Sequence, residues 1–251
     1  MVSKSDLILV AGITGGVGQL VAAKLLAKNL NVRGLTRNKA QAESMFDRQV
    51  ELLEGDLREP NTLVSATKGV DYIICCTGTT AFPSARWDFI NFVQPSNDPQ
   101  AVDSEGVKNL VANAPHDLKR FVFVSSCGVL RKEQFPFKLL NLFGVLDAKL
   151  EAEKAIIASG FPYTIIRPGR LIDGPYTSYD LNTLIRAKTD GKKAVVLENG
   201  DRLNGETSRV DVANVCVESL FYELAVNRDF AIINSGERPQ NTNWEQLFSH
   251  L

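Results

Sequence analysis

The 251-residue sequence predicts an α/β fold, a doubly wound parallel sheet with a small carboxyl-terminal lobe. Over the first two-thirds of the chain, apolar runs of strand length alternate with segments of helical period, the pattern of parallel strands joined by helices. Most of these runs are almost continuously apolar, as strands covered on both faces must be. A glycine-rich turn also separates the first run from the first helical segment.

Strands and helices alternate along this core. Strands are predicted at Leu7–Ala11, Val32–Thr36, Val50–Glu54, Tyr72–Cys76, Arg120–Ser125 and Tyr163–Arg167. The helices between them are predicted at Val17–Lys28, Lys39–Phe46, Asn61–Thr67, Ser104–Asn113 and Phe137–Ser159. Together they predict a six-stranded sheet with helices on both faces.

The pattern changes after Arg167, where prolines and glycines come close together. Strands are predicted at Ala194–Leu197 and Asp229–Asn234, and a helix from Asp211 to Tyr222. We interpret residues 168–251 as a small substrate lobe built onto a core of residues 1–167, and residues 1–251 as a single domain.

The connection from Thr77 to Ala101 is much longer than the roughly 2–6 residues usual in such folds. It contains Phe82, Trp87, Phe89 and Phe92 among prolines. Two interpretations stay open, a lid or binding loop and a locally packed excursion whose aromatic side chains fill a surface groove.

Composition excludes several classes of function. Lys and Arg number 28 against 29 Asp and Glu, so the chain lacks the basic balance of a nucleic-acid-binding protein. Apolar runs such as Phe121–Val124 are far shorter than the ~18 residues of a membrane span. The polar segment Met1–Asp6 shows no signal or transit peptide, which predicts an intracellular, cytoplasmic protein.

The number and spacing of the histidines and cysteines do not predict a metal site. His116 and His250 are the two histidines, too few for a multi-histidine site and poorly placed for a Ser-His-Asp hydrolase. The four cysteines form no C-x-x-C pair. Cys75 and Cys76 stand next to each other in an apolar strand, so we expect one to pack on each face of the sheet.

The turn after the first strand has glycines at the spacing G-x-x-G-x-x-G. In a first strand-turn-helix unit, the first glycine allows a tight turn and the second lets backbone N–H groups approach a pyrophosphate closely. The third lets the helix pack tightly on the strand. The spacing alone is a weak signal, and its position gives it weight. The predicted cofactor-binding residues here are Gly12, Thr14, Gly15, Gly16, Val17 and Gly18.

The residue after the second strand predicts which dinucleotide is bound. Sites that prefer NAD usually have Asp or Glu there to accept the 2′-hydroxyl of the adenosine ribose. This chain has Arg37, whose guanidinium can hold a 2′-phosphate, so NADP(H) is predicted over NAD(H). The alternative is an exposed arginine at the start of a helix.

Two further turns lie where the third and fourth strands end. Asp56 and Leu57 are predicted to contact the adenine, by accepting from its amino group and covering its face. Thr77, Gly78 and Thr79 follow the fourth strand, at the predicted topological switch point where dinucleotides bind. Ordinary turn chemistry is the alternative for both segments.

The motifs stand in the order seen in a known superfamily. They are Gly12-x-x-Gly15-x-x-Gly18, Gly55-Asp56-Leu57, Val124-Ser125-Ser126 and Ile165-Ile166-Arg167-Pro168-Gly169. Over nearly its whole length the chain resembles extended and atypical short-chain dehydrogenases/reductases, and more closely the NmrA-like NAD(P)H-binding proteins of cyanobacterial and chloroplast type. The resemblance implies a Rossmann-like fold and places Pro168, Gly169 and Arg170 among the cofactor-binding residues.

The resemblance also implies catalytic positions. The superfamily uses a serine after the fifth strand, matched by Ser126, and a Tyr-x-x-x-Lys motif, whose lysine matches Lys149 and also holds the nicotinamide ribose. The tyrosine position is Val145, which has no proton to give. Tyr176 and Tyr179 are alternative proton donors, with simple packing as the other interpretation of both.

Two functions remain open on the sequence. The first is an NADP(H)-dependent reductase of a small carbonyl, quinone or flavin-type acceptor. The second is a non-catalytic sensor of the NADPH/NADP⁺ ratio that acts through a protein partner. No nucleic-acid partner and no membrane span are predicted, while peripheral association with a membrane stays open.

Overall fold

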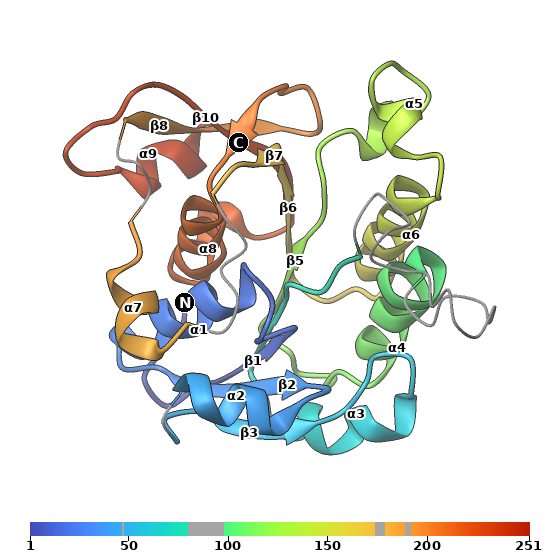
Figure 1. Cartoon of the computed structure of the whole chain (residues 1–251), viewed down its shortest axis with the longest axis vertical. Helices are drawn as coiled ribbons and strands as arrows, with labels where there is room; N and C mark the ends of the chain where they lie inside the picture. The colour runs from blue at the N-terminus through green and yellow to red at the C-terminus, as the bar shows by residue number, and fades with distance from the viewer. Residues whose placement is uncertain (47, 80–97, 174–178, 189–191) are drawn as a thin grey trace.

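The computed structural model describes residues 1–46, 48–79, 98–173, 179–188 and 192–251 (Figure 1). Within these ranges, one sheet has the strand order β3-β2-β1-β4-β5-β6-β10-β8. Its strands are β1 (Leu7–Ala11), β2 (Asn31–Thr36), β3 (Glu51–Glu54), β4 (Tyr72–Cys75), β5 (Arg120–Val124), β6 (Tyr163–Pro168), β8 (Lys193–Asn199) and β10 (Arg228–Glu237). β8 pairs with β10 in antiparallel orientation, and the other neighbours pair in parallel.

Helices cover both faces of this sheet. One face carries α1 (Gly18–Ala27), α2 (Lys39–Phe46), α7 (Leu181–Arg186), α8 (Arg209–Glu218) and α9 (Trp244–Ser249). The opposite face carries α3 (Pro60–Thr67), α4 (Gly106–Ala112) and α6 (Val145–Ala158). Figure 1 shows the two groups of helices on the two sides of the strands. The predicted doubly wound α/β fold is confirmed.

Each face of the sheet has its own apolar core. Along β1, Ile8 and Val10 belong to one core and Leu9 and Ala11 to the other, as the alternation of side chains along a strand requires. Cys75 lies in the core under α3, α4 and α6, while the neighbouring Cys76 packs against the other core. The expected division of the two cysteines between the faces is confirmed.

The carboxyl-terminal lobe contains more elements than the sequence predicts. β10 and β8 extend the main sheet beyond β6, and β7 (Arg170–Leu171) pairs with β9 (Glu206–Thr207) in a separate two-stranded sheet. The helix predicted over Asp211–Tyr222 is α8, which begins at Arg209 because the Ser208 side chain accepts a hydrogen bond from the Asp211 amide. α8 ends at Glu218 and is followed by a 3₁₀ turn over Ser219–Phe221.

The prediction of a single helix over Phe137–Ser159 is wrong. The structure has a short helix α5 (Phe137–Leu140), a break, and then α6 from Val145. Gly144 precedes α6 with φ of 74°, a left-handed conformation that interrupts an α-helix. The Asn141 side chain then accepts hydrogen bonds from the Leu146 and Asp147 amides, which satisfies N–H groups of the first turn of α6.

The strand order reverses between β1 and β4, because β2 and β3 follow on one side of β1 and β4, β5 and β6 on the other. The carboxyl ends of β1 and β4 form the topological switch point, where dinucleotides bind in open sheets of this kind. In the described part of the chain, none of the helices is both long and apolar enough to cross a membrane.

Candidate cofactor site

A cleft of about 200 Å³ lies at the switch point. The turns that follow β1, β2, β3 and β4 supply its walls, together with one residue of the π-helix Gln100–Glu105. Its lining residues are Gly12, Thr14, Gly15, Leu35, Thr36, Arg37, Gly55, Asp56, Leu57, Cys76, Thr77, Gly78 and Val102. Eight of the residues predicted to bind the cofactor thus line one cleft: Gly12, Thr14, Gly15, Arg37, Asp56, Leu57, Thr77 and Gly78.

The glycine turn leaves the floor of the cleft free of side chains. Gly12 has φ of 79°, and a Cβ there would lie 3.0 Å from Cγ2 of Thr77 on the neighbouring strand end. A Cβ on Gly18 would lie 2.1 Å from the Gly12 carbonyl oxygen, so glycine lets α1 pack directly on the turn. The turn that leads into α1 therefore supplies Gly12, Thr14 and Gly15 to the cleft, and the amino end of a helix behind such a turn suits a pyrophosphate.

We expect Gly18→Ala to destabilise the fold by about 1–3 kcal/mol, because the added methyl group meets a backbone carbonyl that moves only with the whole turn. This cost should exceed the gain of about 1 kcal/mol that alanine brings to a helix. Urea unfolding followed by circular dichroism measures the change. Gly15→Ala is the comparison, since its Cβ would lie 3.1 Å from the same oxygen and should cost less. A Gly18→Ala protein as stable as wild type would contradict this packing argument.

Charged groups gather at the end of the cleft formed by β2 and β3. Arg37 lines both the cleft and an adjacent hollow that it shares with Glu54, Asp56 and Glu59. The Asp56 carboxylate accepts hydrogen bonds from the Arg58 backbone amide at 3.0 Å and from Arg58 Nε at 2.9 Å. These bonds, with the positive charge of Arg37 nearby, hold the pKa of Asp56 below its usual value. Asp56 is therefore anionic at neutral pH, a state that accepts hydrogen bonds from an amino group.

Lys149 extends from α6 to the cleft residues Thr77 and Gly78 and is almost completely buried, although it does not itself line the cleft. Its ammonium donates to the carbonyl oxygens of Thr77 at 2.8 Å and Val124 at 3.1 Å, and lies 2.9 Å from Oδ1 of Asp103. The first two contacts are hydrogen bonds, and the third is an ion pair without hydrogen-bond geometry. In this arrangement Lys149 ties the ends of β4 and β5 together, next to Gly78.

Asp103 was missed by the sequence analysis. It is fully buried in the π-helix Gln100–Glu105, beside the cleft residue Val102. Its Oδ2 accepts hydrogen bonds from the Thr79 amide at 3.0 Å and the Thr79 hydroxyl at 2.5 Å. A π-helical turn is rare and is frequently found at functional sites, but it leaves no clear signal in a sequence.

Three of the predicted catalytic residues come from three different segments: Ser126 follows β5, Lys149 lies on α6 and Tyr179 precedes α7. Ser126 is partly exposed after β5, and its hydroxyl donates to the Cys127 carbonyl at 3.0 Å. Val145 begins α6 and is buried, one helical turn before Lys149. Tyr179 is 42% exposed. Tyr176 lies outside the described residues.

The remaining predicted cofactor residues are not among those that line the cleft. Gly169 packs against Gly205, whose carbonyl oxygen would be 2.5 Å from an added Cβ. Arg170 is exposed and forms an ion pair with Glu206 between β7 and β9. The predicted residues that are not among those lining the cleft are Gly16, Val17, Gly18, Thr79, Lys149, Pro168, Gly169 and Arg170. Their predicted roles stay predictions.

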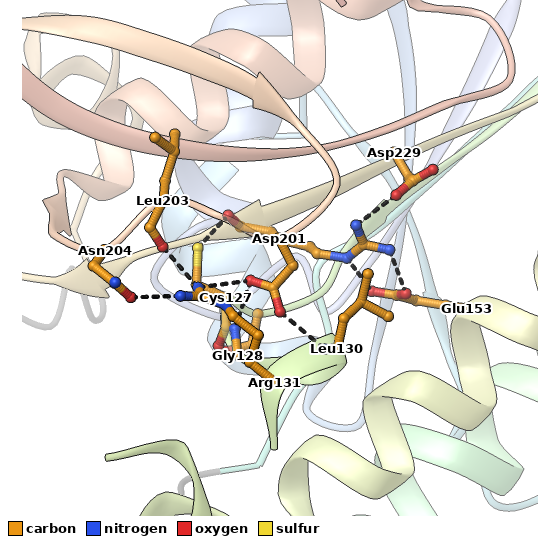
Figure 2. A network of polar contacts seen from close by, with 11 residues as sticks. Cys127, Gly128, Leu130, Arg131, Glu153, Asp201, Leu203, Asn204 and Asp229 are labelled. Carbon is orange, nitrogen blue, oxygen red and sulfur yellow. Dashed lines mark hydrogen bonds and ion pairs between the residues drawn. The ribbon is translucent and has the colours of Figure 1, made fainter. Parts of the chain in front are cut away.

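A buried polar network lies behind Ser126. Ser125 donates to Glu153 at 2.5 Å, and Glu153 accepts from Arg167 Nε at 3.0 Å and Nη2 at 2.7 Å. Arg167 also pairs with Asp229 on β10. Figure 2 labels Glu153 and Asp229, the two carboxylates of this network. Burial raises the pKa of the adjacent Cys127 thiol to about 12. This network joins α6, β6 and β10 and holds the segment after β5 in place.

Comparison with known proteins supports the assignment of this cleft. Residues 12–223 match the model of a family described as NAD(P)H-binding. An uncharacterized chloroplast protein of Arabidopsis thaliana is 32% identical, over 99% of this chain and 83% of its own length. Sanguinarine reductase of Eschscholzia californica is 28% identical, over 99% of this chain and 97% of its own.

The fold is shared with solved structures as well. The oxidoreductase ylbE from Lactococcus lactis superposes with a TM-score of 0.72 at 19% identity, covering 98% of this chain and 96% of its own. The glycine turn, the switch-point cleft and the match over residues 12–223 agree with one another, and they confirm the resemblance found in the motifs. The chain belongs to the family of NAD(P)H-binding proteins.

Proposed function

We propose that this protein is a reductase that uses NADP(H) and passes hydride to a small carbonyl, quinone or flavin-type acceptor. The observation that carries the proposal is the cleft at the switch point, built around the Gly12 turn and lined by Arg37, with Lys149 hydrogen-bonded to the cleft residue Thr77. The similarity to sanguinarine reductase over nearly the full length of both chains supports a reductase rather than another activity. NAD(P)H would supply the hydride, and the protein would position it.

The preference for NADP(H) rests on Arg37. The guanidinium follows β2 at the position where NAD-dependent sites hold a carboxylate for the ribose 2′-hydroxyl. An alternative acceptor is Glu54 at the end of β3, which shares the adjacent hollow with Arg37. A 2′-phosphate gains charge-assisted hydrogen bonds from Arg37, whereas a 2′-hydroxyl gains them from Glu54.

We expect NADPH to bind more tightly than NADH by about 1–3 kcal/mol, roughly 5- to 150-fold, and Arg37→Ala to remove most of this difference. Isothermal titration calorimetry with both cofactors on both proteins measures it. Lys39→Ala is the matched control, because Lys39 is an exposed cation at the start of α2 that does not line the cleft. Equal affinities in the wild-type protein, or an unchanged preference in Arg37→Ala, would contradict the assignment.

A second candidate follows from Val145. Without a tyrosine at this position the protein lacks the superfamily's proton donor, which also suits a non-catalytic sensor of the NADPH/NADP⁺ ratio acting through a protein partner. The two functions differ in turnover: a sensor binds NADPH without oxidising it in the presence of any acceptor. The acceptor screen described in the Discussion separates them.

A further inference from the structure

The turn after β3 contains an arginine that grips the carboxylate of Asp56. Arg58 holds it with a fork, in which Nε donates to Oδ1 at 2.9 Å and Nη2 donates to Oδ2. The Arg58 backbone amide also donates to Oδ1, at 3.0 Å. A fork of this kind fixes both the position and the plane of a carboxylate. Asp56 lines the cofactor cleft and Arg58 is not among the lining residues, so Asp56 is the group that a ligand meets.

The backbone of the same turn is fixed as well. The Thr62 hydroxyl accepts a hydrogen bond from the Asp56 amide at 3.0 Å, and the Asp56 carbonyl accepts one from the Glu59 amide at 2.9 Å. The next residue, Leu57, has its carbonyl held at 2.9 Å by the Asn109 side chain of α4. Since the backbone of Asp56 is already defined, the Arg58 fork decides where its two carboxylate oxygens lie.

The fork also keeps the carboxylate charged. Hydrogen bonds from the Arg58 side chain hold the pKa of Asp56 below its usual value, although burial acts in the opposite direction. The Asp56 carboxylate in turn raises the pKa of Arg58, with a smaller contribution from the negative charge of Asp98 before the π-helix. An ionised carboxylate accepts hydrogen bonds and cannot donate them. Asp56 therefore offers the cleft an acceptor only.

The hydrogen bonds leave part of this acceptor open. A carboxylate has about four lone-pair sites, two on each oxygen. The Arg58 amide and Nε occupy Oδ1, while Oδ2 accepts from Nη2 and from no other group in the described part of the chain. Oδ2 can thus accept one more hydrogen bond. Adenine has a donor at its exocyclic amino group, whereas a base with a carbonyl oxygen at the same position would place an acceptor against a negative charge.

We propose that Arg58 is a positioning residue that selects adenine, because its fork makes Oδ2 of Asp56 a fixed acceptor for the exocyclic amino group of that base. The inference rests on the cofactor site of the proposed function and adds the group that sets its base preference. Arg58 itself does not touch the base. Without the fork, the carboxylate would turn about its Cβ–Cγ bond, and Oδ2 would no longer be held at one place for the amino group.

Calorimetric titration with analogues that differ in the base tests this proposal. The ligands are NAD⁺, NADP⁺ and their two analogues in which hypoxanthine, with a carbonyl oxygen, replaces adenine. We expect the wild-type protein to bind the adenine forms about ten-fold more tightly, with or without the 2′-phosphate. Arg58→Met should reduce this ratio to about three-fold or less. Arg58→Lys keeps the charge without the fork and should restore part of the ratio.

Two further variants complete the experiment. Asp56→Asn should abolish the base preference, since an amide can turn either its oxygen or its N–H groups toward the base. The matched control is Arg33→Met, which breaks a similar fork: Arg33 donates to Glu51 at 2.9 and 3.1 Å, and neither residue lines the cleft. This control should keep the wild-type ratio. Circular dichroism shows that each variant is folded.

Three results would overturn the proposal. They are equal binding of the two bases by the wild-type protein, an unchanged preference in Asp56→Asn, and an equal loss of affinity for both bases in Arg58→Met. The last would show that the fork only stiffens the turn. The ratio between the bases depends neither on the 2′-phosphate nor on turnover. Equal affinity for NADPH and NADH, or a failed acceptor screen, would therefore overturn the proposed function and leave the role of Arg58 standing.

Discussion

Asp103→Leu and Lys149→Met are each expected to lower the free energy of unfolding by about 3–5 kcal/mol, because each leaves the partner as an uncompensated buried charge. Both side chains are almost fully buried, and their charged atoms lie 2.9 Å apart. Asp103→Leu also removes the acceptor of the Thr79 amide and hydroxyl. Urea unfolding of the single variants measures these losses.

The double variant Asp103→Leu/Lys149→Met is the decisive comparison. Replacing a buried ion pair by apolar residues of similar size is often nearly neutral, so we expect the double variant to be more stable than either single variant. A double-mutant cycle gives the coupling energy. Strictly additive losses would show that the two groups do not stabilise each other.

The same pair should affect the cofactor site. Lys149 holds the Thr77 carbonyl and Asp103 holds Thr79, so together they fix the turn that contains Gly78 at the switch point. Calorimetry on the double variant should therefore show weaker NADPH binding even where its stability is close to that of the wild type. This second measurement distinguishes a positioning role from a purely structural one.

The sequence predicts the parallel core because its signals are local. Leu7–Ala11 is an unbroken apolar run, and the structure forms β1 over the same residues. The glycine turn after it is equally local: Gly12 and Gly18 are needed because a side chain at either position would strike backbone or side-chain atoms nearby. Arg37 also lines the cleft from the predicted position, at the end of β2.

Local signals also existed for elements that the sequence analysis missed. α7 begins after Asp180, whose side chain accepts from the Thr183 amide, and α9 begins after Asn243, whose side chain accepts from the Gln246 amide. Asp and Asn are strong N-cap residues. Both helices are short, so their apolar periodicity was too brief to be recognised.

The contacts that complete the site depend on the fold. Asp103 is forty-six positions before Lys149, and only the stacking of the π-helix segment against α6 brings the two charges together. Asp201 reaches the segment after β5 from the far lobe in the same way. A single charged residue in a sequence looks the same whether it becomes buried or stays in solvent. The contacts of Asp103 and Asp201 therefore could not be predicted.

We expect the protein to bind NADPH but to reduce simple aldehydes and ketones slowly, because the resemblance to the superfamily assigns Val145 to the position of its acid. General acid catalysis contributes about 10²–10⁴-fold, and an alkoxide formed by hydride transfer needs that proton at once. Quinones and flavins are different, since their reduced forms can take the proton from water. A screen of NADPH oxidation against aldehydes, ketones, enones, quinones and flavins tests this expectation.

Each outcome of the screen points to particular residues. Turnover with quinones or flavins alone would support a reductase in which Lys149 and Ser126 position the reactants and donate no essential proton. Brisk reduction of aldehydes would contradict the expectation and show that another acid is present, with Tyr179→Phe and Tyr176→Phe as the variants that identify it.

Val145→Tyr provides the converse test: it places a phenol one helical turn before Lys149, and faster ketone reduction in this variant would show that the missing proton donor limits the wild-type rate. Tight NADPH binding with no turnover of any acceptor would instead favour the sensor, because the cleft would then hold the cofactor without passing on its hydride.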